Sequence, residues 1–294
     1  MKRIFISGAS GFLGKNIIEQ TSDLRNVKII AISSRPELIN GVEIIRTDDF
    51  LSREIKCKSE DVFINCLFPT NADGYRMAKG LKTVYKMILK AEENGVGSFI
   101  NISSQSVYGS KRITPSSEED ELCLETPYAV GKFSSEQFCN SVFHDRPHTN
   151  IRMASLLGVG YDQRILNRLI DQALNGNKLK IIGGSQRYGF LDVRDAALGL
   201  LSIASSNSDS WEETYNLGKN ESCTLLDLVC IIKKTIFKIT GKEVSYSIEE
   251  GTDNRNSAID SSKFMKSFVW EPNIALDETA EDIIRDKLKR KPSL

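Results

Sequence analysis

Three glycines near the start of the chain most constrain what it can fold into. In residues 2–18 a short apolar strand, a glycine-rich turn and the start of a helix follow one another, with Gly8, Gly11 and Gly14 spaced G-x-x-G-x-x-G. Glycine lets a chain turn sharply after a strand, approach a pyrophosphate closely and pack a helix tightly on the strand. The free N–H groups of the helix then face the phosphates. The stretch predicts a dinucleotide-binding turn, and a turn that binds nothing is the alternative.

Composition excludes several classes of protein. The 294 residues carry 39 Lys and Arg against 39 Asp and Glu, which argues against an electrostatic nucleic-acid binder but allows a local basic pocket for a phosphorylated small molecule. No apolar run approaches the ~20 residues of a membrane helix, and the first strand leaves no room for a signal peptide. Six scattered cysteines without C-x-x-C predict neither disulfides nor a metal site, and reduced thiols in a cytoplasm are expected.

Strand and helix patterns alternate along the first half of the chain. Apolar runs of strand length stand at 27–33, 42–46, 61–67 and 98–103, and a helical pattern covers 75–94 before Gly95. Continuous apolar runs are typical of parallel strands that are buried on both faces. The order predicts an α/β fold, a Rossmann-like, doubly wound parallel sheet.

The end of the second strand bears on cofactor choice. An acidic residue there binds the ribose 2′-hydroxyl of NAD, whereas a basic residue favours the 2′-phosphate of NADP. This strand runs into Ser33, Ser34 and Arg35, with no acid. The two hydroxyls and the guanidinium suit the 2′-phosphate, so they predict NADP as the cofactor. NAD is the alternative cofactor. Arg35 is also open to interpretation as an ordinary exposed arginine of the loop.

A tyrosine and a lysine carry the predicted chemistry. Tyr128 and Lys132 are four residues apart, so on a helix they share one face. An ammonium near a phenol lowers the pKa of the tyrosine. A serine hydroxyl at the end of the strand before Val107-Tyr108-Gly109 can hold a substrate oxygen. Together these groups predict an acid/base unit for hydride transfer at a carbinol or carbonyl.

With these motifs the sequence resembles the extended short-chain dehydrogenase/reductase family of sugar-nucleotide epimerases, dehydratases and ketoreductases. Further landmarks that match run almost to the end of the chain: residues 151–158, 186–195, 215–218, 224–228, 260–263 and 270–272. The resemblance implies that Ser104, with Ser103 as the fallback, Tyr128 and Lys132 are catalytic.

The resemblance also implies a set of ligand contacts. The expected cofactor contacts are Gly8, Ser10, Gly11, Phe12, Leu13, Gly14, Ser33, Ser34, Arg35, Asp49, Phe50, Cys66, Leu67, Phe68, Ser103, Tyr128, Lys132 and Leu156. The expected substrate contacts are Ser104, Gln105, Ser106, Ser155, Arg187 and Arg255.

Departures from the family pattern narrow the reaction. Dehydratases of the family carry an Asp-Glu pair where this chain has Gln105 and Ser106, so water elimination is not expected. Ser155 replaces the family's phosphate-contacting Asn. The segment Tyr188-Gly189-Phe190 replaces Arg-Asp-Phe, with Arg187 one place earlier.

We therefore expect a reductase of 4-keto sugar nucleotides that uses NADP. The alternatives are a sugar-nucleotide epimerase that retains NAD and, from another class, a non-catalytic dinucleotide sensor. A cofactor domain is expected over 1–158, with 190–218 returning to its sheet, and a substrate lobe over 159–294. By family analogy the helices that contain Tyr128 and residues 75–94 form the face of a homodimer; Val84, Met87, Ile88, Phe133 and Phe138 suit either that face or the core.

Overall fold

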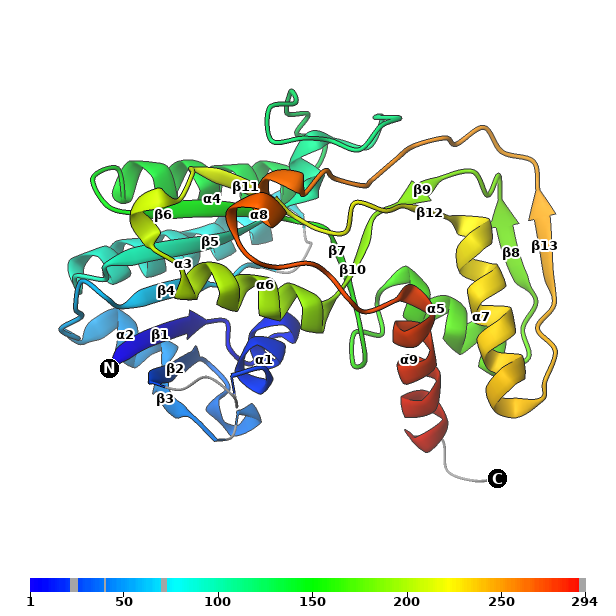
Figure 1. Ribbon diagram of the computed structural model, residues 1–294, viewed down its shortest axis with the longest axis horizontal. Helices are drawn as coiled ribbons and strands as arrows, with labels where there is room; N and C mark the ends of the chain where they lie inside the picture. The colour runs from blue at the N-terminus through cyan, green and yellow to red at the C-terminus, as the bar shows by residue number, and fades with distance from the viewer. Residues whose placement is uncertain (22–25, 40, 70–72, 291–294) are drawn as a thin grey trace.

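A seven-stranded parallel sheet forms the centre of the molecule (Figure 1). The computed structural model describes residues 1–21, 26–39, 41–69 and 73–290. The strand order is β11-β6-β5-β4-β1-β2-β3, which reverses direction beside β1 as in a doubly wound fold. The predicted fold class is confirmed. The strands are β1 (Lys2–Ser7), β2 (Val27–Ser33), β3 (Glu43–Arg46), β4 (Val62–Asn65), β5 (Ser98–Ser104), β6 (His148–Met153) and β11 (Thr214–Leu217).

Helices cover both faces of this sheet. Successive side chains of each strand point to opposite faces and pack against these helices. In β1, Ile4 and Ile6 pack into the apolar cluster that includes α1 and α6, whereas Phe5 packs with α3 and α4 on the other face. The five helices of this part are α1 (Phe12–Glu19), α2 (Thr47–Ser52), α3 (Gly74–Glu93), α4 (Pro127–Val142) and α6 (Val193–Ser205).

Local signals fix where α3 and α4 begin and end. The side chain of Asp73 accepts the N–H of Arg76 at the start of α3, and Gly95 follows its end with φ +77°. Thr126 caps α4 in the same way by accepting from Ala129. The strand predicted over 61–67 is shorter than expected, because it leaves the sheet after Asn65.

The landmark segment 151–158 contains two strands. After β6 the chain turns at Ala154, and β7 (Ser155–Leu157) pairs with β10 (Phe190–Asp192) in a separate two-stranded sheet. Within 190–218, α6 and β11 therefore lie on the large sheet, whereas β10 does not.

A second apolar cluster joins the remaining elements. It is centred on α5, α7 and α9, with the small β8–β13 and β9–β12 sheets beside them (Figure 1). Thr224 and Asp227 form a capping box at the start of α7, and Gly241 ends that helix with φ +70°. The elements are α5 (Ile165–Leu174), β8 (Leu179–Ile182), β9 (Arg187–Tyr188), β12 (Cys223–Thr224), α7 (Leu225–Thr240), β13 (Tyr246–Glu249) and α9 (Leu276–Arg290). The short helix α8 (Ser262–Ser267) packs instead on β11 of the large sheet, through Phe264.

A buried ion pair connects α4 to the sheet. Arg152 of β6 and Glu136 of α4 lie 3.0 Å apart, with side chains 8% and 2% exposed. Glu136 also accepts a hydrogen bond from Ser103 of β5. Arg152 in turn donates to the Tyr108 hydroxyl (3.1 Å), which donates to Asn216 of β11 (2.8 Å). The network ties three strands to one helix.

We predict that Glu136→Ala lowers the free energy of unfolding by about 3–5 kcal/mol, because it leaves the Arg152 charge buried without its partner. Denaturant titration of the full chain measures this loss. Gln137→Ala, at the exposed next position of the same helix, is the control and should change stability by less than about 0.5 kcal/mol. Equal losses in the two variants would contradict the role given to the pair.

Candidate active site

The glycine turn lies against the backbone that follows β4. Gly8 has φ +68°, and a Cβ on it would come within 2.8 Å of the carbonyl carbon of Cys66. A Cβ on Gly14 would lie 2.5 Å from the Gly8 oxygen, so glycine lets α1 start directly over the turn. No side chain caps α1, and its first turn contains no acid. Its free N–H groups suit a phosphate, so the turn fits a dinucleotide.

The end of β2 is joined to this turn. The Ser33 hydroxyl donates to that of Ser10 (2.9 Å) and accepts the N–H of Arg35 (2.9 Å). Arg35 is exposed, and among the described residues no carboxylate pairs with it. It lines a large hollow together with Ser10, Gly11 and Phe12, and Ser34 beside it is also exposed. An uncompensated cation at this point fits an additional phosphate.

Four of the other predicted cofactor residues have side chains that make contacts within the protein. The Phe50 side chain is buried in the core against Phe5 and Phe63, so no ligand can reach it, and the prediction holds at most for its backbone. Asp49 pairs with Arg53 (3.0 Å) on the surface of α2.

The two predicted leucines pack inside the protein. Leu13 packs partly buried against the core, and Leu156 is buried in β7.

Ser104 and Tyr128 meet at the carboxyl end of β5. The Ser104 side chain lies close enough to the Tyr128 phenol to lower its pKa. The Ser103 hydroxyl points instead into the core and donates to Glu136, so Ser103 cannot serve as the fallback. Burial raises the pKa of Tyr128, and the charge of Arg164 and the Ser104 side chain oppose this rise.

Lys132 lies one turn further along α4 and is fully enclosed. Its Nζ donates to the Ile102 carbonyl (2.7 Å) and sits 3.8 Å above the Phe68 ring, whose edge meets the Tyr128 ring. Burial lowers the pKa of Lys132 to about 7, although Cys66 and Glu136 favour its charged form. Arg164 is a positive charge that lowers the pKa of Tyr128 in this structure, and the same effect of Lys132 stays a prediction.

The predicted substrate residues are divided between two places. Gln105 and Ser106 follow Ser104 directly, in the 3-10 turn Gln105–Tyr108. The side-chain amide oxygen of Gln105 accepts a hydrogen bond from Arg112. The buried Ser106 hydroxyl has no hydrogen-bond partner among the described residues. Ser155 lies in β7.

Arg187 and Arg255 lie together in the second lobe. Arg187 donates to the Ser222 hydroxyl (3.2 Å), and Arg255 pairs with Asp253 (2.6 Å). Their backbones are hydrogen-bonded to each other (2.8 Å). Within the described part of the chain, no hydrogen bond or ion pair connects either one to Ser104, Tyr128 or Lys132.

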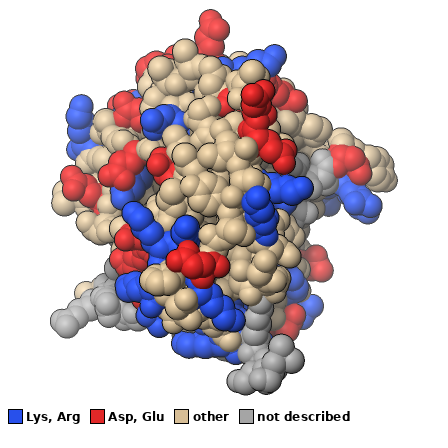
Figure 2. All heavy atoms as spheres, turned by 90° about the vertical axis from the view of Figure 1, so that its right-hand side faces the viewer, with Lys and Arg blue, Asp and Glu red and all other residues tan. Residues whose placement is uncertain are grey.

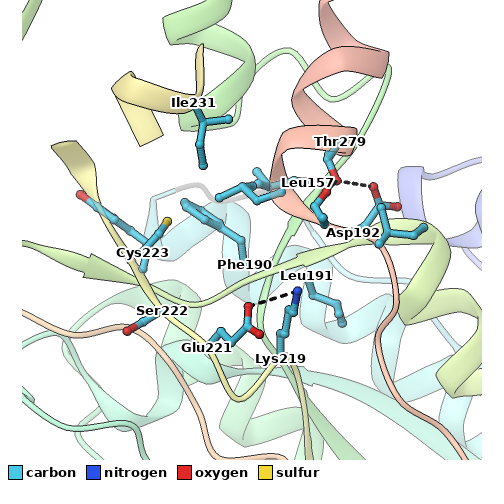
Figure 3. Close-up of a pocket in the computed structure, with 14 residues that line it drawn as sticks. Leu157, Phe190, Leu191, Asp192, Lys219, Glu221, Ser222, Cys223, Ile231 and Thr279 are labelled. Atoms are coloured by element: carbon cyan, nitrogen blue, oxygen red, sulfur yellow. Dashed lines mark hydrogen bonds and ion pairs between the residues drawn. The ribbon is translucent and has the colours of Figure 1, made fainter. Parts of the chain in front are cut away.

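A separate pocket lies between β10, β12, α7 and α9 (Figure 3). Phe190, Leu157 and Ile231 give it an apolar wall, and Lys219 pairs with Glu221 (3.1 Å) at one side. None of the three predicted catalytic residues lines it. It is therefore not the centre of the chemistry.

Sequence reasoning missed several residues of the site. Arg164, Tyr161 and Arg112 stand in segments of irregular pattern, so no periodicity marks them. A signal did exist for Arg152 and Glu136. An arginine inside an apolar strand needs a partner, and Glu136 continues the four-residue spacing of Tyr128 and Lys132.

Comparison with known proteins decides the family. The model of the NAD dependent epimerase/dehydratase family matches residues 4–218. The chain belongs to this family. The resemblance to extended short-chain dehydrogenases/reductases is thereby confirmed, and the protein is an enzyme of the epimerase/dehydratase family.

Relatives within the epimerase/dehydratase family catalyse different reactions. UDP-glucuronic acid decarboxylase 1 of Xenopus tropicalis is 26% identical, over 94% of this chain and 70% of its own length. The dTDP-4-dehydro-6-deoxyglucose reductase of Escherichia coli is 23% identical, over 96% of both chains. The structure of UDP-glucuronic acid 4-epimerase from Bacillus cereus in complex with NAD superposes with a TM-score of 0.82 at 20% identity, over 98% of this chain and 100% of that one.

We predict a pH-dependent stability difference for Lys132→Met. The folded pKa of about 7 is below the unfolded value of ~10.4, so the folded state binds fewer protons between these pH values and wild-type stability rises across that window. Below pH 7 the cost of burying the charge is present in full. Replacement by Met removes this cost, so the variant gains more stability at pH 7 than at pH 9.5.

Denaturant unfolding at both pH values measures this difference. Lys79→Met, on the exposed surface of α3, is the control and should show no such dependence. A gain for Lys132→Met that is the same at pH 7 and pH 9.5 would contradict the assigned pKa.

Proposed function

We propose that this enzyme reduces the keto group of a 4-keto sugar nucleotide with NADPH. The observation that carries the proposal is the unpaired Arg35 beside the Ser10–Ser33 hydrogen bond, where an NAD-specific site has an acid. A preference for the phosphorylated cofactor indicates an enzyme that consumes reducing equivalents, since an epimerase recovers its NAD within each cycle.

The catalytic residues have distinct tasks in this reaction. The reduced nicotinamide, when bound, supplies the hydride. Tyr128 donates its phenolic proton to the carbonyl oxygen, and Ser104 donates a hydrogen bond that polarises the same carbonyl. Burial raises the pKa of Tyr128 and so keeps it protonated until it is needed. Lys132 would hold the nicotinamide ribose, and burial lowers its pKa to about 7.

The residues after Ser104 favour reduction over elimination. Gln105 and Ser106 carry no ionisable group, so they cannot transfer the protons that elimination of water requires. Arg112 donates to the side-chain amide oxygen of Gln105, so the N–H groups of that amide are left to donate to a substrate oxygen. The E. coli reductase, which matches almost its whole length, supports this reaction class.

A 4-epimerase with retained NAD is the second candidate. The observation in its favour is the set of similar structures, which includes UDP-glucuronic acid 4-epimerase in complex with NAD. Both reactions use the same Ser104, Tyr128 and Lys132, so the fate of the cofactor separates them.

We further propose that the enzyme is a cytoplasmic homodimer. Val84, Met87 and Ile88 are core residues and cannot form an interface, but Tyr85 (39% exposed) and Val130 (46%) present apolar surface on α3 and α4. Light scattering should report twice the chain mass of 32.9 kDa, and a monomer would refute the dimer.

In the described part of the chain, no helix combines the length and apolarity that crossing a bilayer requires.

The surface charge agrees with a small-molecule substrate. On the face shown in Figure 2, Lys and Arg alternate with Asp and Glu, so no field of one sign covers it.

We predict that Tyr128→Phe binds NADPH as tightly as wild type but loses turnover by a factor of at least about 100, because the carbonyl oxygen no longer receives its proton. The measurement is NADPH oxidation with a panel of 4-keto sugar nucleotides, alongside fluorescence titration of NADPH. Tyr246→Phe, exposed on β13 of the second lobe, is the control. Normal turnover by Tyr128→Phe would show that the assigned mechanism is wrong.

A further inference from the structure

One arginine joins the end of the catalytic strand to the second lobe. The Arg112 guanidinium donates a hydrogen bond to the side-chain oxygen of Gln105. It also donates to the backbone carbonyls of Gly109 (3.2 Å) and Ala258 (2.9 Å). Its central carbon lies 5.4 Å from the centre of the Tyr108 ring. Three hydrogen bonds and a ring contact therefore hold this guanidinium between two parts of the molecule.

The contact with Ala258 belongs to a longer seam between the two lobes. Residues 253–261, here called the connecting segment, run from β13 toward α8 and pass the chain that follows β5 (Figure 1). The N–H of Asn256 donates to the Arg112 carbonyl (2.7 Å), and that of Ser116 donates to the Ala258 carbonyl (3.2 Å). Arg112 is thus fixed through its backbone as well as through its side chain, so it gives Gln105 a stationary partner.

Arg112 determines which way the Gln105 amide points. A guanidinium has donors and no acceptor, so the atom of the amide that faces it must be the oxygen. The amide nitrogen then lies on the other side, and no described residue accepts a hydrogen bond from it. Gln105 directly follows Ser104 in the chain. Two free N–H groups are therefore held beside the predicted catalytic serine.

The place of Arg112 is unfavourable unless its donors are used. Burial lowers the pKa of Arg112 to about 10, because its charge is partly removed from water. Within the described part of the chain it has no carboxylate in an ion pair, and its hydrogen-bond acceptors are neutral oxygens. An apolar side chain would fill the same space without this cost. The charge is therefore retained for the contacts that it makes, of which the one with Gln105 reaches the predicted site.

We propose that Arg112 is a positioning residue that fixes Gln105 as a hydrogen-bond donor to the C3 hydroxyl of a 4-keto sugar nucleotide. The inference rests on the proposed function for the reacting carbonyl. Ser104 holds the C4 oxygen and Gln105 is the next residue, so the group that Gln105 meets is carried by a neighbouring carbon of the ring. In a pyranose C3 carries a hydroxyl, whereas C5 carries the ring oxygen and C6. A site built to donate to this hydroxyl disfavours the substrate that lacks it.

The test compares kcat/KM of the full chain with NADPH for two matched substrates, a 4-keto-6-deoxyhexose nucleotide and its 3-deoxy analogue. The pair is prepared on UDP, dTDP, CDP and GDP. Wild type should prefer the 3-hydroxy substrate by about tenfold, the contribution of one neutral hydrogen bond. Arg112→Met should reduce this preference to about two- to threefold, and Gln105→Ala should remove it. Lys111→Met, exposed next to Arg112, is the control and should keep the preference.

The ratio between the two substrates separates positioning from a structural role. A general loss of structure in Arg112→Met lowers kcat/KM for both substrates equally and leaves the preference unchanged, and this result overturns the proposal. Gln105→Ala keeps the Arg112 bonds to Gly109 and Ala258, so it tests the same contact even if Arg112→Met does not fold. A preference that survives in Gln105→Ala overturns the proposal.

The wild type distinguishes the inference from the proposed function. Equal use of the two substrates by wild type overturns the inference and leaves the proposed function standing. Wild type that reduces neither substrate on any of the four nucleotides contradicts the proposed function and the inference together.

Discussion

The attachment of α4 to β5 and β6 is the constraint on which the site depends. Tyr128, Lys132 and Glu136 follow one another on a single face of the helix, and each faces one of the last three residues of β5. Glu136 accepts from Ser103, Lys132 donates to Ile102, and Ser104 acts on the pKa of Tyr128. The Arg152–Glu136 pair fixes the far end of this series in the core. A slip of the helix by one turn would therefore separate all three contacts at once.

The same burial that positions these groups sets their protonation. Enclosure raises the pKa of Tyr128 and lowers that of Lys132 to about 7, so both neutral forms are favoured. Arg164 supplies a positive charge from outside the helix, which favours the tyrosinate that remains after proton transfer. The chemistry of the tyrosine is thus controlled by three elements, α4, β5 and the segment before α5, and not by the helix alone.

Much of this arrangement could be predicted from the sequence. Short apolar runs and the glycine turn predict the parallel sheet. The four-residue spacing of Tyr128 and Lys132 predicts that they share one face of a helix. The choice between Ser103 and Ser104 depends on which side of β5 faces the core, and Glu136 decides it. Phe50 shows the same limit, since its burial comes from contacts with Phe5 and Phe63 that are distant in the chain. The charge of Arg164 could not be assigned either, because it comes from a loop without periodicity.

The central claim is that the enzyme consumes NADPH, and the dinucleotide it carries and prefers tests this most directly. Freshly purified protein is denatured, any released dinucleotide is identified, and the emptied protein is titrated with NADPH and NADH. The account predicts little retained NAD and a preference for NADPH that disappears in Arg35→Ala. Tightly retained NAD, with no preference for NADPH, would contradict it and identify an epimerase.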